Sequence, residues 1–560
     1  NVFEFQGLKD NPSLGNADSY DWDHGGPKND KEWAWFLNRH RYFEDLYVAF
    51  RKTGDPKYKE KLFQILDDWL GKYADAPSGM SFSSAWRPLE AARRVLESWD
   101  IIYLKLWSDP NFESSLKSKF LASLENHGDY LQNHHALFGN HLITEMIALL
   151  KVSLLLPEAK NSSQWQEYAL SKLSKEYDKQ VYPEGAHKEL SSHYQRVVAL
   201  NYEKLLSLLK ISENTDLIEA WTPKVDRLWE YFSAIQKPNG YAPLNNDSDR
   251  ENVFSLLKRN GRDPSQPIDS LYFPNAGQVV IRGDARRASN LWSFFDIGPR
   301  GSDHQHEDFM HVSLSFGDLD VLVDNGRYTY QPGKWRNYFQ GPRSHNLLLV
   351  DELQTESKPN VAKGPLHGTG FIEGSHYEAA WGNASFHNTV GDREADWQRI
   401  VIRVPSDNLL IIDHLITFKT RLIEGYWHSA PLVDWTLHSD HITAEKDASS
   451  SKITYANSGT ESLDLSLEIG VNAQTVAGWH SPRFNLKKPA YSLHYQTTVS
   501  TPTVFAWLFS HQNDPSAIKA IELNGREFRL AYQNDEGNFE IGGRLPIRGE
   551  KLTLTIQRKN

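Results

Sequence analysis

Apolar residues recur at helical spacing through the first 268 residues of the chain. The runs Leu62–Trp69 and Val198–Leu209 place an apolar residue at every third or fourth position, which puts these side chains on one face of an α-helix. Breakers such as Asp109-Pro110 and Pro157 separate such runs at intervals that fit successive helical hairpins. Residues 1–268 are therefore predicted to form an all-α domain.

The pattern changes in the rest of the chain, where short alternating or β-branched runs such as Leu319–Val323 follow one another. One hairpin is explicit, because Ile400–Val404 and Leu409–Ile412 flank the turn sequence Pro405-Ser-Asp-Asn408. Strands that follow helices, instead of alternating with them, predict two domains and no βαβ sheet. We therefore expect an α+β protein whose second domain, residues 269–560, is mostly β.

Composition narrows the classes of protein that fit this pattern. The chain has 560 residues, of which 39% are hydrophobic, enough for two or more domains with their own cores. No apolar run approaches the ~20 residues that a membrane span needs. Cysteine is absent, which excludes disulfides, thiolate metal sites and cysteine nucleophiles. Any metal would have to be held by His, Asp or Glu.

The charge argues against a nucleic-acid partner. With 61 Lys and Arg against 72 Asp and Glu the net charge is -11, so an acidic polymer could be held only by a local basic cleft. The 18 Trp and 24 Tyr suit stacking against sugar faces, although core packing accounts for most of them. Neither membrane nor nucleic acid is expected as a partner, and the sequence predicts no particular oligomeric state.

Two clusters of polar residues in the helical half have both a structural and a functional interpretation. Asn140, in Gly139-Asn140-His141, opens a predicted helix, where asparagine commonly caps the free N–H groups. Tyr194 follows Glu189-Leu-Ser-Ser-His193, just before a predicted helix. A tyrosine at such a place can simply pack its ring and hydrogen-bond its hydroxyl, so a catalytic role needs further support.

The most unusual stretch of the sequence is Asp303-His304-Gln305-His306. If it is extended, His304 and His306 share one face, where two imidazoles are costly to bury unless a metal or a carboxylate binds them. Asp324, at the end of a predicted strand, and His345 could join His306. Together they would form a His/Asp/His site for zinc or another divalent ion, built from nitrogen and oxygen ligands.

These clusters, in this order, resemble the heparinase II/III-like polysaccharide lyases, and the resemblance covers most of the chain. It also includes Glu32–Arg41, Tyr272–Pro274, Arg282-Gly283, Arg336–Phe339 and Ser344–Asn346. The resemblance implies an incomplete α/α toroid followed by an antiparallel β-sandwich. It also implies a bacterial protein that is secreted or periplasmic and from which a signal peptide has been removed.

The resemblance also implies catalytic roles. Asn140 and His141 would contact the substrate carboxylate, Tyr194 would be the acid and could also serve as base, and His304 would be a second base. Some alginate-acting relatives use a further tyrosine from the β domain, which Tyr330 or Tyr338 could supply. The residues predicted to bind substrate are Asn38, His40, Trp86, Arg87, His193, Tyr338 and Arg343.

The metal site is implied in the same way. His306, Asp324 and His345 match the ligands of the structural ion, zinc in the first instance, found in several members of the family. The ion would brace the loops of the β domain and would not activate water. No organic cofactor is expected.

The chemistry of β-elimination explains why such residues are needed. The proton α to a uronate carboxylate is too weakly acidic to be removed unless the carboxylate charge is neutralised and the enolate-like state is stabilised by fixed donors. Tyrosine has an ordinary pKa of about 10, so Tyr194 can act as an acid without help but as a base only if its pKa is lowered. The expected products carry 4,5-unsaturated uronate ends. A glycosaminoglycan (heparan sulfate, chondroitin or hyaluronan) is the first expectation for the substrate, and alginate or another polyuronate is the second.

Two other classes of function stay open on the sequence alone. His304-x-His306-x-Asp308 faintly resembles the metal motif of metallo-β-lactamase-like hydrolases, but Phe309 stands where that motif has histidine. A toroid glycoside hydrolase or a non-catalytic sugar-binding protein would instead use carboxylates, for which Glu184, Glu189 and Asp247 are available. Product chemistry separates these alternatives, because only a lyase leaves a new double bond.

Overall fold

The computed structural model describes the whole chain except residues 1, 6, 15–18, 266, 288, 299–303, 352, 356–367, 460–461, 512–515, 535, 547–549 and 560. Asp303 of the histidine motif therefore lies outside the described residues. The chain divides into two compact units. Unit 1 comprises Asn1–Val181 and Val197–Asp226, and unit 2 comprises Tyr182–Arg196 and Arg227–Asn560.

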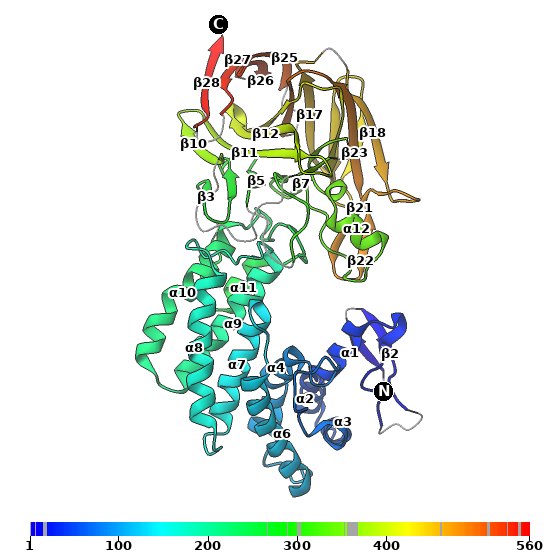
Figure 1. Ribbon diagram of the computed structural model, residues 1–560, viewed down its shortest axis with the longest axis vertical. Coiled ribbons are helices and arrows are strands. Elements are labelled where there is room, and N and C mark those ends of the chain that lie inside the picture. Colours follow the sequence, from blue (N-terminus) through cyan, green and yellow to red (C-terminus); the bar gives the residue numbers. More distant parts are fainter. Residues whose placement is uncertain are drawn as a thin grey trace. The chain divides into compact units, whose positions relative to one another are not determined.

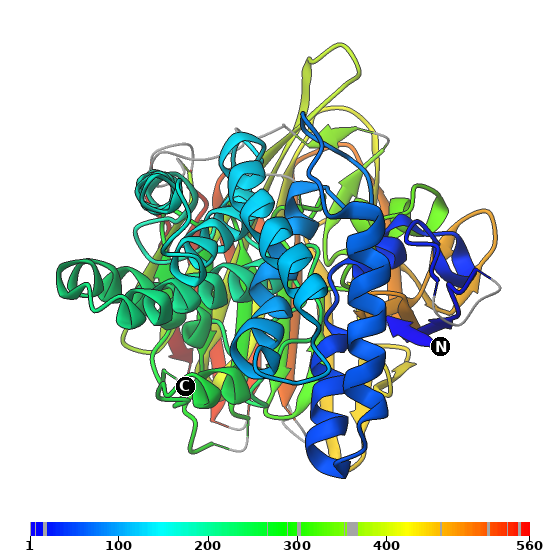
Figure 2. The same cartoon turned by 90° about the horizontal axis from the view of Figure 1, so that it is seen from below.

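Unit 1 is built from helices, drawn from blue to teal in Figures 1 and 2. They are α1 (Lys31–Asn38), α2 (Tyr42–Thr53), α3 (Lys57–Tyr73), α4 (Pro88–Glu97), α5 (Trp99–Ile101), α6 (Ser114–Asn133), α7 (Gly139–Leu155), α8 (Ser162–Gln180) and most of α9 (Ser192–Ile211) and α10 (Thr215–Ala234). Short elements complete it: β1 (Phe3–Phe5), β2 (Leu8–Asp10), the 3-10 turn Gly26–Lys28 and the π-helical turn Ile102–Leu106. The predicted all-helical character of this half is thereby confirmed apart from one two-stranded hairpin at its start.

The helix α7 forms the centre of unit 1. It packs against α4, α6 and α8, and Leu142, Ile147, Ala148 and Val152, which point to different sides of the helix, are all buried. A helix that is apolar all round is stable only when other helices surround it. Among the described residues, no helix is both long enough and apolar enough to cross a membrane.

Unit 2 holds the helices α11 (Val253–Arg259) and α12 (Lys334–Gln340) and a series of antiparallel sheets. A five-stranded sheet runs in chain order through β3 (Leu271–Phe273), β4 (Gln278–Arg282), β5 (Leu291–Asp296), β6 (Val312–Phe316) and β7 (Leu319–Leu322). A nine-stranded sheet has the order β10 (Gly370–Gly374), β11 (Tyr377–His387), β12 (Arg393–Val404), β13 (Asn408–Ile416), β24 (Thr503–His511), β17 (Ser449–Asn457), β16 (Ile442–Lys446), β15 (Asp434–Leu437), with β9 (Gln354–Thr355) beside β11.

Smaller sheets complete unit 2. One four-stranded sheet has the order β18 (Asp464–Ile469), β23 (Tyr491–Val499), β14 (Arg421–His428), β8 (Leu348–Val350). Two hairpins pair β19 (Val471–Asn472) with β20 (Val476–Ala477) and β21 (Trp479–Arg483) with β22 (Leu486–Pro489). A C-terminal sheet runs in chain order through β25 (Ala517–Asn524), β26 (Glu527–Asn534), β27 (Gly537–Arg544) and β28 (Thr553–Lys559).

The predicted hairpin is confirmed and contributes to the main core of unit 2. Strands β12 and β13 pair from Asp396↔Ile416 to Val404↔Asn408. Their inward residues join a cluster that includes Trp397, Trp427 and Trp507, each fully buried. Burying one large apolar side chain stabilises a fold by roughly 1.5–3 kcal/mol. These sheets are therefore stable, and they hold the loops beside them in place.

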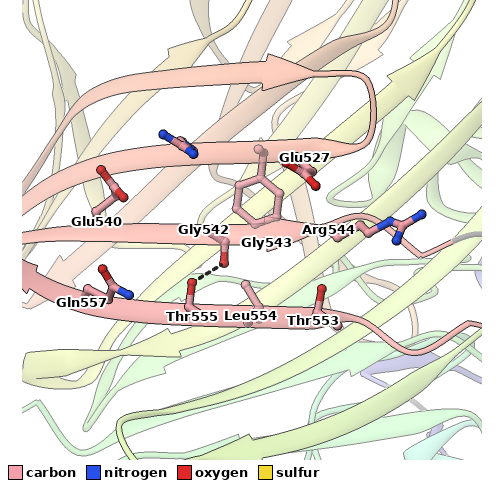
Figure 3. A pocket seen from close by; sticks show the side chains of 11 residues that line it. Glu527, Glu540, Gly542, Gly543, Arg544, Thr553, Leu554, Thr555 and Gln557 are labelled. Carbon is pink, nitrogen blue, oxygen red and sulfur yellow. Dashed lines mark hydrogen bonds between the residues drawn. The ribbon is translucent and has the colours of Figure 1, made fainter.

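The C-terminal sheet shows how alternation along a strand divides its two faces. Phe528, Leu530, Ile541 and Leu554 point inward into a second core cluster, as the two-residue period of a strand requires. The opposite face is polar, and Figure 3 shows side chains of β26, β27 and β28 around a shallow pocket on it, with the Thr555 hydroxyl donating to a backbone carbonyl.

Candidate active site and metal centre

Tyr194 lies in the first turn of α9, and hydrogen bonds hold this turn against the segment that precedes α11. The Ser192 hydroxyl donates to the Pro243 carbonyl at 2.6 Å. The Asn246 amide donates to the carbonyl of Leu190 at 3.0 Å, and Leu190 has a left-handed backbone with φ 49°. These bonds fix the chain direction just before Tyr194, so its ring is carried by a rigid element.

The Tyr194 hydroxyl lies among groups from the β-rich part of unit 2. Its oxygen is 2.9 Å from the hydroxyl oxygen of Tyr330, and Arg327 donates to that second oxygen at 2.5 Å. The His304 ring stacks on the Tyr194 ring, with centroids 3.8 Å apart and planes 10° apart. Two tyrosines and an imidazole are thus brought together. The two tyrosines are 136 positions apart in the sequence.

The surroundings of the two tyrosines favour their protonated forms. Burial raises the pKa of Tyr194 well above its ordinary value, and the neighbouring Tyr330 adds to the rise. Burial also raises the pKa of Tyr330 to about 12, although Arg327 acts in the opposite direction. Both phenols therefore hold their protons at neutral pH, which suits Tyr194 to donate a proton and not to remove one.

Asp247 connects this group to the predicted metal site. One carboxylate oxygen accepts from Nδ1 of His304 at 3.1 Å and the other accepts from Nε2 of His306 at 2.8 Å. Arg336 donates to both oxygens, at 2.5 and 3.0 Å. Burial alone would raise the pKa of Asp247, but the hydrogen bonds from the two histidines and from Arg336 outweigh it and hold the pKa well below its ordinary value.

These bonds also determine which ring nitrogens carry protons. A carboxylate can only accept, so His304 must donate through Nδ1 and His306 through Nε2. In the neutral form of each ring, the other nitrogen then has a free lone pair. This leaves Nε2 of His304 available to take up a proton, and Nδ1 of His306 available to bind a metal.

His306, Asp324 and His345 come together as predicted. One ligand atom from each lies within 4.8 Å of the others, and all three residues are buried. Nδ1 of His306 and Nε2 of His345 are buried atoms with no hydrogen-bond partner, which is costly unless a ligand satisfies them. Burial would raise the pKa of Asp324, but His345 and His311 outweigh it, so the carboxyl is held ionised. The residues fit a divalent cation bound by nitrogen and oxygen.

The loop that carries His345 is anchored to the main core. Arg399, itself buried and paired with Asp413 at 2.7 Å, donates to the backbone carbonyl of Asn346 at 2.5 Å. The Asn346 amide in turn donates to the carbonyls of Val312 and Val323 at 2.8 and 3.2 Å. The loop that carries this metal ligand is thus held by hydrogen bonds to β6 and to Val323, the residue that follows β7.

Several residues of this site were not predicted. Arg327 pairs with Asp249 at 2.9 Å as well as contacting Tyr330, and Glu251 accepts from Nδ1 of His193 at 2.7 Å. The sequence holds one signal for these carboxylates, because Asp247, Asp249 and Glu251 alternate within five residues. The sequence predicts Asp247 only as a possible carboxylate of a toroid hydrolase or a sugar-binding protein.

Of the other residues predicted in unit 2, His193 lies beside Tyr194, with ring centroids 5.3 Å apart. Tyr338 does not join this group, because its ring is buried and its hydroxyl donates to the Trp479 carbonyl at 3.4 Å. Arg343 is half-exposed and pairs with Glu424 at 3.0 Å. Tyr330 is therefore the tyrosine of the β-rich part that meets Tyr194.

The remaining predicted residues belong to unit 1. Asn140 and His141 lie in the first turn of α7. The guanidinium of Arg87 lies over the Trp35 ring at 3.8 Å and donates to the buried Glu90 at 2.9 Å. The roles predicted for Asn140, His141 and Arg87 stay predictions.

Three of the residues predicted to bind substrate have structural partners in the core of unit 1. Asn38 accepts from the indole of Trp69 at 3.0 Å, and His40 accepts from that of Trp99 at 3.2 Å. The indole of Trp86 donates to a backbone carbonyl at 3.0 Å. All three predicted residues are buried, and their packing lends no support to a substrate contact.

Comparison with known proteins gives matches along most of the chain. The family model described as "Heparinase II/III N-terminus" matches residues 2–264, and the model described as "Heparinase II/III-like, C-terminal" matches residues 265–520. The chain is 24% identical over 571 residues to a heparin-sulfate lyase of Pedobacter heparinus, an alignment that covers 95% of this chain and 80% of that one. It is 25% identical over 390 residues to a heparin-sulfate lyase of Bacteroides thetaiotaomicron, covering 61% of this chain and 54% of the relative.

Solved structures resemble the protein over nearly its whole length. A crystal structure of heparinase III matches with a TM-score of 0.78 at 17% identity, covering 95% of this chain and 86% of the other. A heparan sulfate lyase from Pedobacter heparinus matches with a TM-score of 0.65 at 20% identity, covering 97% and 86%. At these identities the matches establish the fold, and the predicted fold class, a helical toroid followed by an antiparallel β-sandwich, is confirmed.

Proposed function

Because the chain belongs to the heparinase II/III family, we propose that it is a polysaccharide lyase that cleaves a glycosaminoglycan by β-elimination at a uronic acid residue. The observation that supports this proposal most directly is the position of Tyr194, whose hydroxyl lies 2.9 Å from that of Tyr330 and whose ring stacks against the His304 ring. The curated relatives that match are heparin-sulfate lyases, which favours a glycosaminoglycan as the polymer.

Tyr194 acts as the acid in this proposal. In elimination, the C5–H bond breaks, its electron pair forms the C4=C5 double bond, and the C4–O4 bond breaks as the acid protonates O4. Tyr194 holds its proton at neutral pH. Once it has given this proton to O4, the Tyr330 hydroxyl can donate to the phenolate oxygen while Arg327 donates to Tyr330. The chain of donors stabilises the charge that Tyr194 acquires.

His304 acts as the base that removes the C5 proton. Asp247 fixes its ring through Nδ1 and leaves Nε2 with the lone pair. As the ring takes up the proton, the nearby carboxylate stabilises the imidazolium that forms. Asn140 and His141 are proposed to neutralise the substrate carboxylate, which makes the C5 proton more acidic.

His306, Asp324 and His345 are proposed to hold a divalent ion, zinc in the first instance because two histidines and one aspartate are ligands that zinc accepts. The bound ion supplies a fixed positive charge that ties together the loops bearing these ligands. His306 also donates to Asp247, so the same loops position the base. Metal analysis of the purified protein tests this assignment. The wild type should contain the ion, and His345→Ala, which lacks one ligand, should not.

Alginate is the second candidate substrate, and the contact between Tyr194 and Tyr330 favours it, because alginate-acting relatives are expected to use two tyrosines. A secreted or periplasmic location is proposed for either substrate, since a polymer of this size does not cross a cell membrane unaided.

The proposal is tested by ultraviolet absorbance of digests of heparan sulfate, chondroitin sulfate, hyaluronan and alginate. We expect absorbance to rise on at least one polymer and the rate to fall by about 10²–10⁴ in Tyr194→Phe and in His304→Ala, the range that a general acid or base contributes. Tyr103→Phe is the matched control, because it makes the same chemical change at a tyrosine of unit 1 whose ring packs against Trp107. New reducing ends without absorbance would identify a hydrolase and disprove the proposal.

A further inference from the structure

A second cavity of unit 2, of about 190 Å³, has a wall rich in cationic side chains. Its lining comes from the segment between α10 and α11, from β6 and β7, from the loop after β14, from the end of β16 and from the hairpin β21–β22. The basic residues in this lining are Lys237, Arg250, Lys446, His480 and Lys488, and the acidic ones are Asp320 and Asp324. Neither Tyr194 nor His304 belongs to the lining.

The charges of this lining do not cancel. Lys237 pairs with Asp320 at 2.7 Å, and Asp324 belongs to the proposed metal centre. In the part of the chain that the structure describes, Arg250, Lys446 and Lys488 have no ion pair. The lining thus carries four cationic side chains, Lys237, Arg250, Lys446 and Lys488, against two carboxylates, and this excess of positive charge favours binding of an anion.

His480 adds a buried polar side chain to the wall of the cavity. It lies on β21, directly opposite Lys488 on β22, so both side chains project from the same face of the hairpin. Its residue exposure is only 5%, yet its Nδ1 is buried without a hydrogen-bond partner. A buried polar atom left unsatisfied costs free energy, and the same histidine lines the cavity.

We propose that this cavity binds a sulfate group carried by an acidic saccharide. Several cations converge on it from separate segments, which suits a tetrahedral oxyanion with oxygens pointing in different directions better than a planar carboxylate held by one arginine fork. The size of the cavity fits one such group with part of its sugar, not a length of polymer. The part of this proposal that places the sulfate on a saccharide rests on the proposed lyase function.

Calorimetric titration of the whole protein tests this proposal at low ionic strength, because salt screens such contacts. The three probes are a sulfated glycosaminoglycan disaccharide, the same disaccharide without sulfate, and inorganic sulfate. We expect the sulfated disaccharide to bind about tenfold more weakly to the double variant Arg250→Gln, Lys488→Gln than to the wild type. Lys519→Gln, which removes an exposed lysine on β25 away from the cavity, should bind as the wild type does.

The other outcomes are equally specific. Lys488→Arg should retain binding, and thermal unfolding of each variant identifies any that has failed to fold. If binding of the sulfated disaccharide is unchanged in the double variant, or the desulfated one shows the same dependence on Arg250 and Lys488, the proposal is wrong. If inorganic sulfate alone depends on these residues, the site takes a free oxyanion and the saccharide part is wrong.

This test separates failure of the inference from failure of the proposed function. Binding is measured without turnover, and elimination is followed independently by ultraviolet absorbance. A protein that binds the sulfated probe through Arg250 and Lys488 but releases no unsaturated product would disprove the lyase proposal alone. A protein that eliminates normally but binds no sulfate at this cavity would disprove the cavity assignment alone.

Discussion

Two buried carboxylates, Asp247 in unit 2 and Glu145 in unit 1, have opposite electrostatic surroundings. Asp247 accepts hydrogen bonds from two histidines and an arginine, and its pKa lies well below the ordinary value. Glu145, on α7, accepts one bond from the Ala136 backbone at 2.7 Å, and burial raises its pKa to about 7. Burial is similar at the two sites, so the donors around each carboxylate determine its charge.

The difference indicates what each part of the molecule can do near neutral pH. Asp247 is a constant negative charge that orients His304 and His306, and it does not exchange protons itself. Glu145 loses its proton near pH 7 and makes α7, the helix that also begins with Asn140 and His141, sensitive to pH. The proposed chemistry therefore depends on the constant charge of Asp247. The stability of the helical unit depends on the charge of Glu145, which changes near pH 7.

Asp247→Asn should give the largest effect. The amide keeps the shape but cannot accept on both sides, so His304 and His306 lose their fixed orientation and Arg336 loses its partner. We expect kcat to fall by about 100-fold and the bound ion to be lost, with the free energy of unfolding lowered by about 3 kcal/mol. Steady-state kinetics, metal analysis and urea unfolding measure the three effects.

Asp407→Asn is the control, because Asp407 is also buried in unit 2 and pairs with Arg403 at 3.3 Å. This variant should lose stability but keep its ion and most of its activity. If Asp247→Asn behaves like Asp407→Asn, then Asp247 has only a structural role.

Glu145→Gln should remove a pH dependence of stability. The native pKa of Glu145 is raised to about 7, above the ordinary value of about 4.3, so the folded state binds the proton more tightly. Its contribution is fully present below about pH 4 and is lost as the pH rises through about 7. Relative to Glu145→Gln, the wild type should lose about 3 kcal/mol between pH 4 and pH 8.

Urea unfolding, followed by the circular dichroism of the helices, measures this difference across the pH range. The neighbours Arg87 and Glu90 act on Glu145 in opposite directions, so neither should dominate the result. If the unfolding free energies of the wild type and Glu145→Gln change in parallel with pH, the pKa of Glu145 is not raised in the folded state.

Some of the elements and site residues of the two units could be predicted from the sequence, and others could not. The helical spacing around α7 and the turn between β12 and β13 are local patterns, so both elements could be predicted from short windows. Tyr194, His304 and the three metal ligands stand out through residue type and through a resemblance to a known family. The structure brings these five residues together within unit 2, whereas Asn140 and His141 belong to unit 1.

The role of Asp247 could not be predicted, because it depends on contacts with residues 57 and 59 positions away. Arg327 lies in an irregular segment and Arg336 lies in the short helix α12, and nothing in the local sequence separates a cation with a buried partner from a solvated one. Asn38, His40 and Trp86 illustrate the opposite case. Their residue types suit sugar binding, but the aromatic core of unit 1 uses the same types for packing and internal hydrogen bonds.

Tyr330→Phe should give an intermediate effect that tests the donor chain to Tyr194. The ring still packs against Arg327 and Phe484, but no hydroxyl remains to donate to the Tyr194 phenolate. Losing one hydrogen bond to a developing charge corresponds to about 1.4 kcal/mol, or about tenfold in kcat. A loss as large as that of Tyr194→Phe would make Tyr330 the acid or base itself, as the alginate alternative requires.

Arg343→Gln should give the smallest effect. The side chain of Arg343 is 48% exposed and pairs with Glu424, and such surface pairs contribute at most about 1 kcal/mol. The free energy of unfolding should therefore hardly change, in contrast to the buried network of Asp247. If Arg343 binds an acid group of the substrate as predicted, KM should rise by up to about fivefold at unchanged kcat, and the rise should shrink as salt is added. An unchanged KM at low salt would remove Arg343 from the substrate-binding residues and leave it as a surface partner of Glu424.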